Sequence, residues 1–356
     1  MRRFPLVLVL ALVAAIADPN VGTGTAGLRS GGVVAILGAQ SAAPPPSSEW
    51  LAGVRAEALA RGIAPAVVEA ALGNLPEPLP SVIERDRAQA EVVETLEQYI
   101  ARRASRRTAA AGRTHLIRHR ALLAKVSRRY GVPAPLLVSI WGIESNYGRF
   151  SGVRPTVAAL ATLAWDPRRA AFFRNELFSA LEIVNRGDIE LAKMRGSWAG
   201  AMGQVQFMPS SYLQYAEDFD GDGRRDIWGT PADVFASIAN YLRGHGWVAG
   251  ERWGREVRVS NAAATRIAAD VPRRDGTCQA ARDMTIRLPL ARWTDLGVTL
   301  PGGERLPSST LEAALVSGSR RHFLVYRNYD ALLEYNCAHA YALAVGLLGD
   351  AVAAAP

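Results

Sequence analysis

The sequence predicts a mainly α-helical protein of the α+β class, with a small β-containing part near its C-terminal end. Over most of the first 250 residues, apolar side chains recur with helical spacing. Residues 255–316 instead scatter β-branched side chains among Gly and Pro, which is typical of short strands and loops. Helical spacing then returns towards the end. The 356 residues are enough for one large or two modest domains.

The N-terminal segment has the features of an export signal. Arg2 and Arg3 precede an apolar run over residues 4–17, which is shorter than the ~20 residues that a spanning helix needs. Residues 18–48 are rich in Gly, Ala, Ser and Pro, as linkers are. We therefore expect residues 1–43 to be a signal peptide and linker, and the protein to be periplasmic. An uncleaved membrane anchor is the alternative. No cysteine lies near the signal, so no lipid attachment is expected.

Helical segments are expected wherever the apolar spacing is sustained between Gly and Pro breaks. The expected helical segments are 50–72 with a break at 62–65, 88–130 with an interruption near Gly112, 133–147, 156–185, 209–216, 231–244 and 329–348. Three prolines between residues 76 and 80 predict an extended connector. A last strand is expected at 323–326.

Glu144 is the most informative residue of the chain. It lies near the end of the 133–147 helix, and Leu137, Ile140 and Trp141 share its helical face. An apolar setting removes water from a carboxyl group and raises its pKa, and the carbonyl end of a helix also disfavours the anion. Such a group can hold a proton near neutral pH and deliver it to a leaving oxygen. The alternative is a solvated Glu in an exposed last turn.

A second motif, GSWAGAMGQVQFMPSS, occupies residues 196–211. Its glycines let the backbone approach a ligand closely. Its Ser and Gln side chains offer hydrogen bonds without charge, while Phe and Met provide apolar walls, as in many sugar-binding clefts. The alternative is a tight turn between helices that is capped by Ser210 or Ser211.

The two motifs together resemble those of the lytic murein transglycosylases, in particular the membrane-bound lytic transglycosylase B family (glycoside hydrolase family 103). The resemblance covers about residues 50–348 and includes the segment 238–247 and Tyr335–Asn336. It implies a lysozyme-like helical core, an added helical domain and a small β-containing part, all within a catalytic region over residues 44–350. The core would occupy about 130–250 and 322–350, and the β-containing part about 255–320.

The resemblance implies cleavage of the bond between N-acetylmuramic acid (MurNAc) and N-acetylglucosamine (GlcNAc) in peptidoglycan, with formation of 1,6-anhydromuramyl ends. Neither motif contains a second Asp or Glu beside Glu144. A single carboxyl group can act first as acid and then as base if the attacking group is the sugar's own C6 hydroxyl. A lysozyme-like hydrolase and a non-catalytic wall-binding protein are the alternatives.

Several residues match the family's substrate-binding positions, and for the tyrosines plain core packing is the alternative. These residues are Ser197, Gln206, Tyr241, Tyr335, Asn336 and Tyr341. Tyr341 is expected a turn and a half beyond Tyr335 on one closing helix. Trp198 and Gln204 stand where some family members have tyrosine.

Residues 218–226 fit the first nine positions of an EF-hand loop, although position 12 is Gly229 rather than Glu. Some family members bind calcium here, so we expect structural Ca²⁺ and no organic cofactor. The expected ligands are the carboxylates of Asp218, Asp220, Asp222 and Asp226 and the backbone carbonyl of Arg224. An acidic turn without metal is the alternative.

The two cysteines, Cys278 and Cys337, can pair as one disulfide in an exported protein, with two buried thiols as the alternative. The net charge of +8 favours an acidic partner. The densest Arg run, 102–129, lacks interleaved aromatics and matches no nucleic-acid module, so nucleic acid is not expected. The expected partners are peptidoglycan glycan strands and cell-wall synthesis proteins, and the chain is expected to be a monomer.

Overall fold

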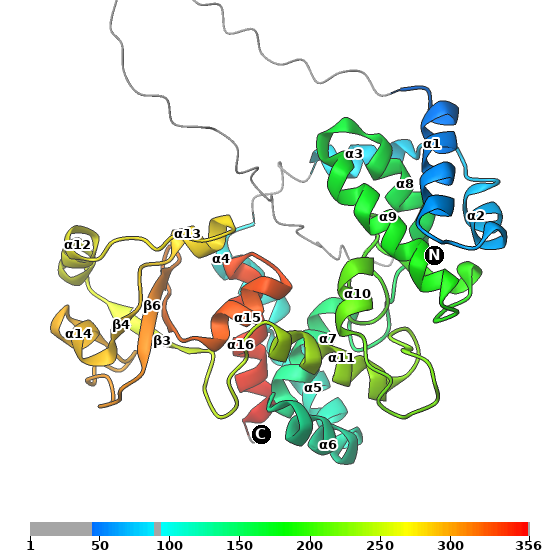
Figure 1. The fold of residues 1–356 in the computed structure, drawn as a ribbon. Coiled ribbons are helices and arrows are strands. Elements are labelled where there is room, and N and C mark those ends of the chain that lie inside the picture. Colours follow the sequence, from blue (N-terminus) through cyan, green and yellow to red (C-terminus); the bar gives the residue numbers. More distant parts are fainter. Residues whose placement is uncertain (1–44, 89–93, 355–356) are drawn as a thin grey trace, which may run out of the picture.

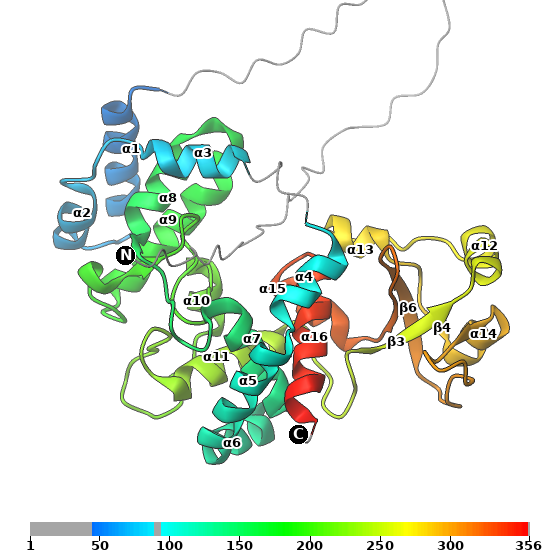
Figure 2. The same cartoon turned by 180° about the vertical axis from the view of Figure 1, so that it is seen from behind.

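The computed structural model describes residues 45–88 and 94–354, which form three parts (Figure 1). A helical lobe lies at one end, a helical core lies in the middle, and a lobe built on a sheet lies at the other end (Figure 2). The fold is mainly α, as predicted. Over the described ranges, no helix is both long and apolar enough to cross a bilayer. The predicted signal peptide and linker, residues 1–43, fall outside them.

The helical lobe combines three N-terminal helices with two from the middle of the chain. Its first three are α1 (Ser47–Ala60), α2 (Pro65–Leu72) and α3 (Pro80–Ala88). They pack against α8 (Thr156–Trp165) and α9 (Ala170–Asn185). The break between α1 and α2 falls at the predicted Gly and Pro positions, because proline at the first helical position has its φ already set for a helix.

The core places α7 (Ala134–Ser145) between helices from distant parts of the sequence (Figure 1). The other core helices are α4 (Leu96–Arg103), α5 (Arg106–Arg118), α6 (Arg120–Tyr130), α10 (Pro209–Tyr215), α11 (Pro231–Gly244), α15 (Asn328–Tyr335) and α16 (His339–Ala353). The last helix, α16, packs against α4, α5 and α7. The helical core therefore reaches back to residue 96, before the predicted start at about 130, because α4 and α5 cover the same apolar helices as the C-terminal segment.

The third part is a five-stranded antiparallel sheet of order β4-β6-β7-β3-β5 with its own apolar core around Trp293. Its strands are β3 (Gly254–Val259), β4 (Leu288–Pro289), β5 (Val298–Thr299), β6 (Glu312–Ser317) and β7 (His322–Val325). The sequence indicated strands and loops here, and β7 matches the predicted last strand. The short helices α12 (Asn261–Asp270), α13 (Gln279–Asp283) and α14 (Leu290–Asp295) were not predicted, because they are too short to show a sustained apolar repeat.

Gly112 does not interrupt the helices of residues 88–130, contrary to the prediction. It lies buried inside α5, where a Cβ would come within 2.6 Å of Val352 and 3.0 Å of the Tyr147 hydroxyl. The glycine therefore allows close packing between helices rather than a turn. The chain breaks instead at Ser105, whose side chain caps α5 by accepting from the Thr108 N–H, and at His119.

Two other predicted helices are each divided. The segment 156–185 breaks at Asp166, which accepts a hydrogen bond from the Arg168 N–H and starts the short 3₁₀ turn Pro167–Arg169. The closing segment breaks between α15 and α16 at residues 336–338. Tyr341 is therefore not on the helix of Tyr335, and the predicted single helix over 329–348 is wrong.

Candidate active site

Glu144 is the next-to-last residue of α7 and is 8% exposed. Leu137, Ile140 and Trp141, which helical spacing placed on its face, are all buried. The helix ends at Asn146, whose left-handed backbone closes the last turn. The apolar helix therefore carries its one carboxyl group into the interior of the core.

The Glu144 carboxyl has a direct partner in Tyr341, whose hydroxyl donates a hydrogen bond of 2.5 Å to Oε1. Burial raises the pKa of Glu144 to about 7, while the Tyr341 hydrogen bond and the nearby Arg103 charge oppose this rise. A group with such a pKa exchanges its proton readily near neutral pH. This carboxyl can therefore serve both as an acid and as a base.

A row of tyrosine rings continues from Tyr341. The ring of Tyr335 stacks on that of Tyr341 with centroids 6.2 Å apart, and the ring of Tyr241 follows at 4.8 Å from Tyr335. The hydroxyls of Tyr335 and Tyr241 donate to the backbone carbonyls of Val205 and Glu334, both at 2.7 Å. These three predicted residues lie together. Two of their hydroxyls are hydrogen-bonded to backbone carbonyls and so stabilise the surrounding backbone.

The second motif is joined to the Glu144 region by a short strand pair. Strand β1 (Arg154–Pro155) pairs antiparallel with β2 (Arg195–Gly196), where the motif begins. Gly152 makes this approach possible: its φ is 103°, and a Cβ there would lie 2.3 Å from the Gly196 backbone. The two motifs are thus adjacent in space although they are distant in sequence.

Ser197 and Gln206 stabilise the turn of the second motif from within. The Ser197 hydroxyl accepts hydrogen bonds from the Ala199 and Ala201 N–H groups at 3.3 and 3.1 Å. The Gln206 amide donates to the Gly203 carbonyl at 2.8 Å. Its Oε1, like Oδ1 of Asn336, is buried without a hydrogen-bond partner in the described part of the chain. Two buried acceptors are therefore available for a donor such as a sugar hydroxyl.

Backbone strain is concentrated in the two motifs. In the described residues, three non-glycine residues have positive φ: Asn146 at 52°, Tyr147 at 60° and Gln206 at 53°. Such conformations are costly and persist where the surrounding structure enforces them, often at functional sites. All three lie beside Glu144 in sequence or within the second motif.

Three residues around Glu144 were not among the predicted site residues. Gln204 accepts from the Trp141 indole at 2.7 Å and donates to the Trp228 carbonyl at 2.6 Å, so it ties α7 to the second motif. Burial raises the pKa of Tyr99, and the charge of Glu144 adds to this rise, which places the two side chains close together. Arg103 donates to the carbonyl of the residue before Glu144.

A capping pattern in the sequence could have located the helix that carries Tyr99 and Arg103. The Thr95 hydroxyl accepts from the Gln98 N–H, and the Gln98 side chain accepts from the Thr95 N–H. This T-x-x-Q box marks the start of α4. Helical spacing would then have placed Tyr99 and Arg103, four residues apart, on one face.

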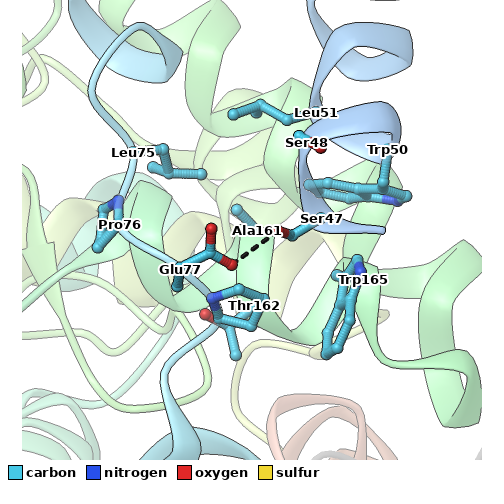
Figure 3. A pocket seen from close by; sticks show the side chains of 11 residues that line it. Ser47, Ser48, Trp50, Leu51, Leu75, Pro76, Glu77, Ala161, Thr162 and Trp165 are labelled. Carbon is cyan, nitrogen blue, oxygen red and sulfur yellow. Dashed lines mark hydrogen bonds between the residues drawn. The ribbon is translucent and has the colours of Figure 1, made fainter. Parts of the chain in front are cut away.

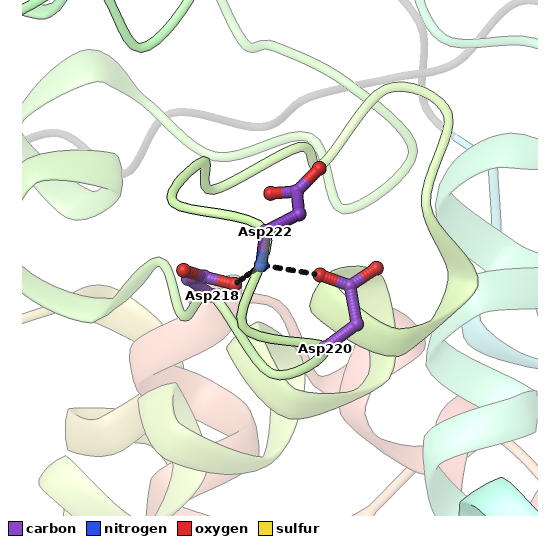
Figure 4. A group of neighbouring side chains, drawn as sticks. All are labelled: Asp218, Asp220 and Asp222. Atoms are coloured by element: carbon purple, nitrogen blue, oxygen red, sulfur yellow. Dashed lines mark hydrogen bonds between the residues drawn. The ribbon is translucent and has the colours of Figure 1, made fainter.

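The aspartate loop brings three of its predicted ligands together (Figure 4). Carboxylate oxygens of Asp218, Asp220 and Asp222 lie within 4.8 Å of one another. Asp226 is used differently, since its oxygens accept from the N–H groups of Trp228 and Gly229 and from the Thr230 hydroxyl. The backbone N–H of Arg224 donates to Asp222 at 2.8 Å.

Asp233, which lies beyond the loop, fastens both of its ends. It accepts from the Phe219 N–H and from the Asp226 N–H, each at 2.8 Å. Burial raises its pKa to about 6. An all-oxygen set of three converging carboxylates suits a hard cation such as Ca²⁺, and the loop is held at both ends in that shape.

Cys278 and Cys337 form a disulfide with their Cα atoms 6.3 Å apart. Cys278 precedes α13 of the sheet lobe, and Cys337 lies in the break between α15 and α16. The bond therefore anchors the segment that carries Tyr335 and Asn336.

A cavity of about 130 Å³ lies in the helical lobe, between α1, the proline connector and α8 (Figure 3). Trp50 and Trp165 line it, and the Ser47 hydroxyl donates to Glu77 beside it at 2.7 Å. None of the predicted catalytic or sugar-binding residues lines this cavity. It is therefore separate from the site around Glu144.

The helical core, whose helix α7 carries the buried Glu144 carboxyl, belongs to a known class of proteins. Residues 46–350 match the family described as Transglycosylase SLT domain. This match spans most of the chain, so the protein belongs to that family, as the sequence motifs indicated.

Individual relatives agree with this assignment. The chain is 36% identical to membrane-bound lytic murein transglycosylase B of Escherichia coli over 228 residues, which are 64% of this chain and 58% of that protein. It therefore aligns with less than two thirds of that relative's length.

Solved structures extend the likeness to most of the chain. SltB3 from Pseudomonas aeruginosa, in complex with NAG-NAM-pentapeptide, has a TM-score of 0.77 and 40% identity, and the match covers 86% of this chain and 79% of SltB3. SltB3 is also known with NAG-anhNAM-pentapeptide. E. coli Slt35 in complex with calcium has a TM-score of 0.70 and 28% identity, with 86% and 93% of the two chains covered. These neighbours confirm the lysozyme-like, mainly α fold.

Proposed function

We propose that this protein is a lytic transglycosylase that cleaves the MurNAc–GlcNAc bond of peptidoglycan and leaves 1,6-anhydromuramyl ends. The observation that carries the proposal is the buried Glu144 carboxyl, whose pKa is about 7 and whose direct partner is a tyrosine hydroxyl. The relative SltB3, which is known in complex with NAG-NAM-pentapeptide and with NAG-anhNAM-pentapeptide, supports this choice of substrate and product.

Glu144 would act twice on one bond. Its proton passes to the glycosidic oxygen as the bond to C1 breaks, and the carboxylate then takes the proton of the C6 hydroxyl as that oxygen bonds to C1. The buried acceptors of Gln206 and Asn336 and the rings of Tyr241, Tyr335 and Tyr341 would bind the sugars. Ser197 would act by shaping the turn.

The acidic loop would hold a structural calcium ion through Asp218, Asp220 and Asp222. A relative that is known in complex with calcium supports this assignment. The ion would brace the loop and take no part in the chemistry. Action in the periplasm is proposed from the signal-like N-terminus and from the disulfide, because disulfides persist in oxidising compartments.

Digestion of purified sacculi in heavy-oxygen water tests the reaction. Transglycosylation gives products that are lighter by one water and carry no heavy oxygen, because the attacking oxygen belongs to the sugar. Reducing ends labelled with heavy oxygen would instead identify a lysozyme-like hydrolase. Binding to sacculi without release of fragments would identify a wall-binding protein.

A further inference from the structure

Arg103 is the last residue of α4 and contacts the backbone of α7 next to the catalytic residue Glu144. Its guanidinium donates to the carbonyl oxygen of Ile143, the residue before Glu144. The ring of Tyr99, one turn earlier on α4, has its centroid 5.9 Å from the guanidinium carbon. The cation is thus held between the backbone of the catalytic helix and a ring of its own helix, in a fixed position.

Across residues 45–88 and 94–354, no carboxylate forms an ion pair with Arg103. Glu94 pairs with the neighbouring Arg102 at 2.6 Å, and the charge of Arg103 adds to the lowering of the Glu94 pKa without such a pair. The Nε of Arg103 is buried and has no acceptor among the described residues. The Arg103 side chain is half-buried, and its charge lowers the pKa of the buried Glu144 carboxyl.

We propose that Arg103 is a positioning residue that sets the acid strength of Glu144 by facing it without pairing with it. This inference rests on the proposed function. A direct ion pair would hold Glu144 as a carboxylate and remove its proton before the sugar bond breaks. With no cation nearby, the buried acid would hold its proton too tightly to release it. The Arg103 cation is held by its hydrogen bond to the Ile143 carbonyl, near Glu144 but not paired with it, and this arrangement avoids both outcomes.

The other groups that face Glu144 are neutral at pH 7. Tyr99 comes from α4, Tyr335 from α15 and Tyr341 from α16, and each lies close enough for the Glu144 charge to raise its pKa further than burial alone does. On α5, His115 faces Trp141 instead. Arg103 is therefore the charged member of this group.

Arg103 neither gives nor receives a proton in the reaction. The proton of Glu144 goes to the leaving oxygen, and the proton of the C6 hydroxyl returns to Glu144 when the new bond forms. Between these steps the carboxylate is a buried anion, and a fixed cation stabilises it without reorganisation.

Two substitutions separate the charge of Arg103 from its hydrogen bond. Arg103→Gln can still donate to the Ile143 carbonyl but carries no charge, whereas Arg103→Lys keeps the charge. The rate of fragment release from purified sacculi is measured across pH. We expect the maximal rate of Arg103→Gln to fall roughly tenfold, and the alkaline limb of its pH–rate profile to move to higher pH. Arg103→Lys should keep the alkaline limb of the wild-type pH–rate profile. Arg106→Gln, at the exposed start of α5, changes the net charge equally and should shift nothing.

A folded Arg103→Gln protein with an unmoved limb would overturn the proposal, as would an equal loss of rate at every pH. If that variant does not fold, Arg103→Met is measured in the same way. Infrared titration of the Glu144 carboxyl, with Glu144→Gln as the reference, needs no substrate. An unchanged titration in both uncharged variants also overturns the role of Arg103. This readout is independent of product analysis, so a failure of the proposed reaction and a failure of the Arg103 role are distinguished.

Discussion

The chain holds carboxylates in two opposite environments. Glu144 is buried in the core, and its direct hydrogen-bond partner is the Tyr341 hydroxyl. Asp220 and Asp222 are exposed, and together with Asp218 they accept several backbone N–H groups of their own loop. Burial favours the protonated acid, whereas solvent and N–H donors favour anions that can bind a cation. The same chemical group thus suits proton transfer in one region and metal binding in the other.

The strongest test of this contrast is Glu144→Gln. The variant keeps the size of the side chain and one donor but cannot transfer a proton, so we expect fragment release from sacculi to fall by roughly 10³-fold. Exposed Glu190→Gln should retain the wild-type rate. Lysis by a folded Glu144→Gln protein at the original rate would contradict the catalytic assignment.

The second test concerns stability and pH. The pKa of Glu144 is about 7 in the folded protein against an ordinary 4.5, so the folded state binds more protons between these values. Its unfolding free energy should therefore fall as pH rises from 4.5 through 7, by about 3 kcal/mol. Glu144→Gln removes this penalty, so it should melt above the wild type at pH 8 but close to it at pH 4.5.

The control for the second test is Ile117→Val, a change in an exposed side chain without a titratable group. The melting difference between Ile117→Val and the wild type should not change over the same pH range. A Glu144→Gln effect that is equal at both pH values would show that the carboxyl is not the source of the pH dependence.

The third test removes the hydroxyl that contacts Glu144. Tyr341→Phe loses a hydrogen bond that lowers the pKa of Glu144, so the alkaline limb of the pH profile should move upward. A loss of about 2 kcal/mol corresponds to a roughly 30-fold lower rate. Tyr326→Phe removes a buried hydroxyl from the sheet lobe and should leave the profile unchanged. If Tyr341→Phe and Tyr326→Phe have the same rate and the same pH profile, the hydrogen bond between Tyr341 and Glu144 does not contribute to catalysis.

The smallest expected effect belongs to the acidic loop. Calcium at ten times its dissociation constant should stabilise the protein by about 1.4 kcal/mol, measured as a higher melting temperature. The double variant Asp218→Asn/Asp220→Asn should lose this response, and Asp270→Asn on α12 should keep it. Equal melting of the wild type in calcium and in chelator would remove the metal from the proposal.

The sequence predicted best where a feature depends on local spacing. Helical periodicity placed Glu144 beside Leu137, Ile140 and Trp141, and this burial follows from one helix alone. The helix prediction failed at Gly112, because a glycine that lets a neighbouring helix pack closely looks the same in sequence as one that breaks a helix. The helices of the sheet lobe were missed for a similar reason, since they are short and packing stabilises them.

The surroundings of Glu144 were predicted only in part. Family motifs pointed to Tyr241, Tyr335 and Tyr341, but the contact between Tyr341 and Glu144 spans 197 residues of sequence. Gln204 and Arg103 act through single long-range contacts with α7, and no local pattern encodes such contacts. Tertiary packing, rather than helix propensity, determines these positions.

The position of Tyr341 late in the chain has a consequence for biosynthesis. Translation produces α7 long before α16, which completes the core and supplies the phenol partner of Glu144. A nascent chain that has emerged only as far as the sheet lobe therefore carries the acid without its final environment. We expect cutting activity to arise only after the ribosome has released nearly the entire polypeptide, so that premature termination before Tyr341 leaves an inert product.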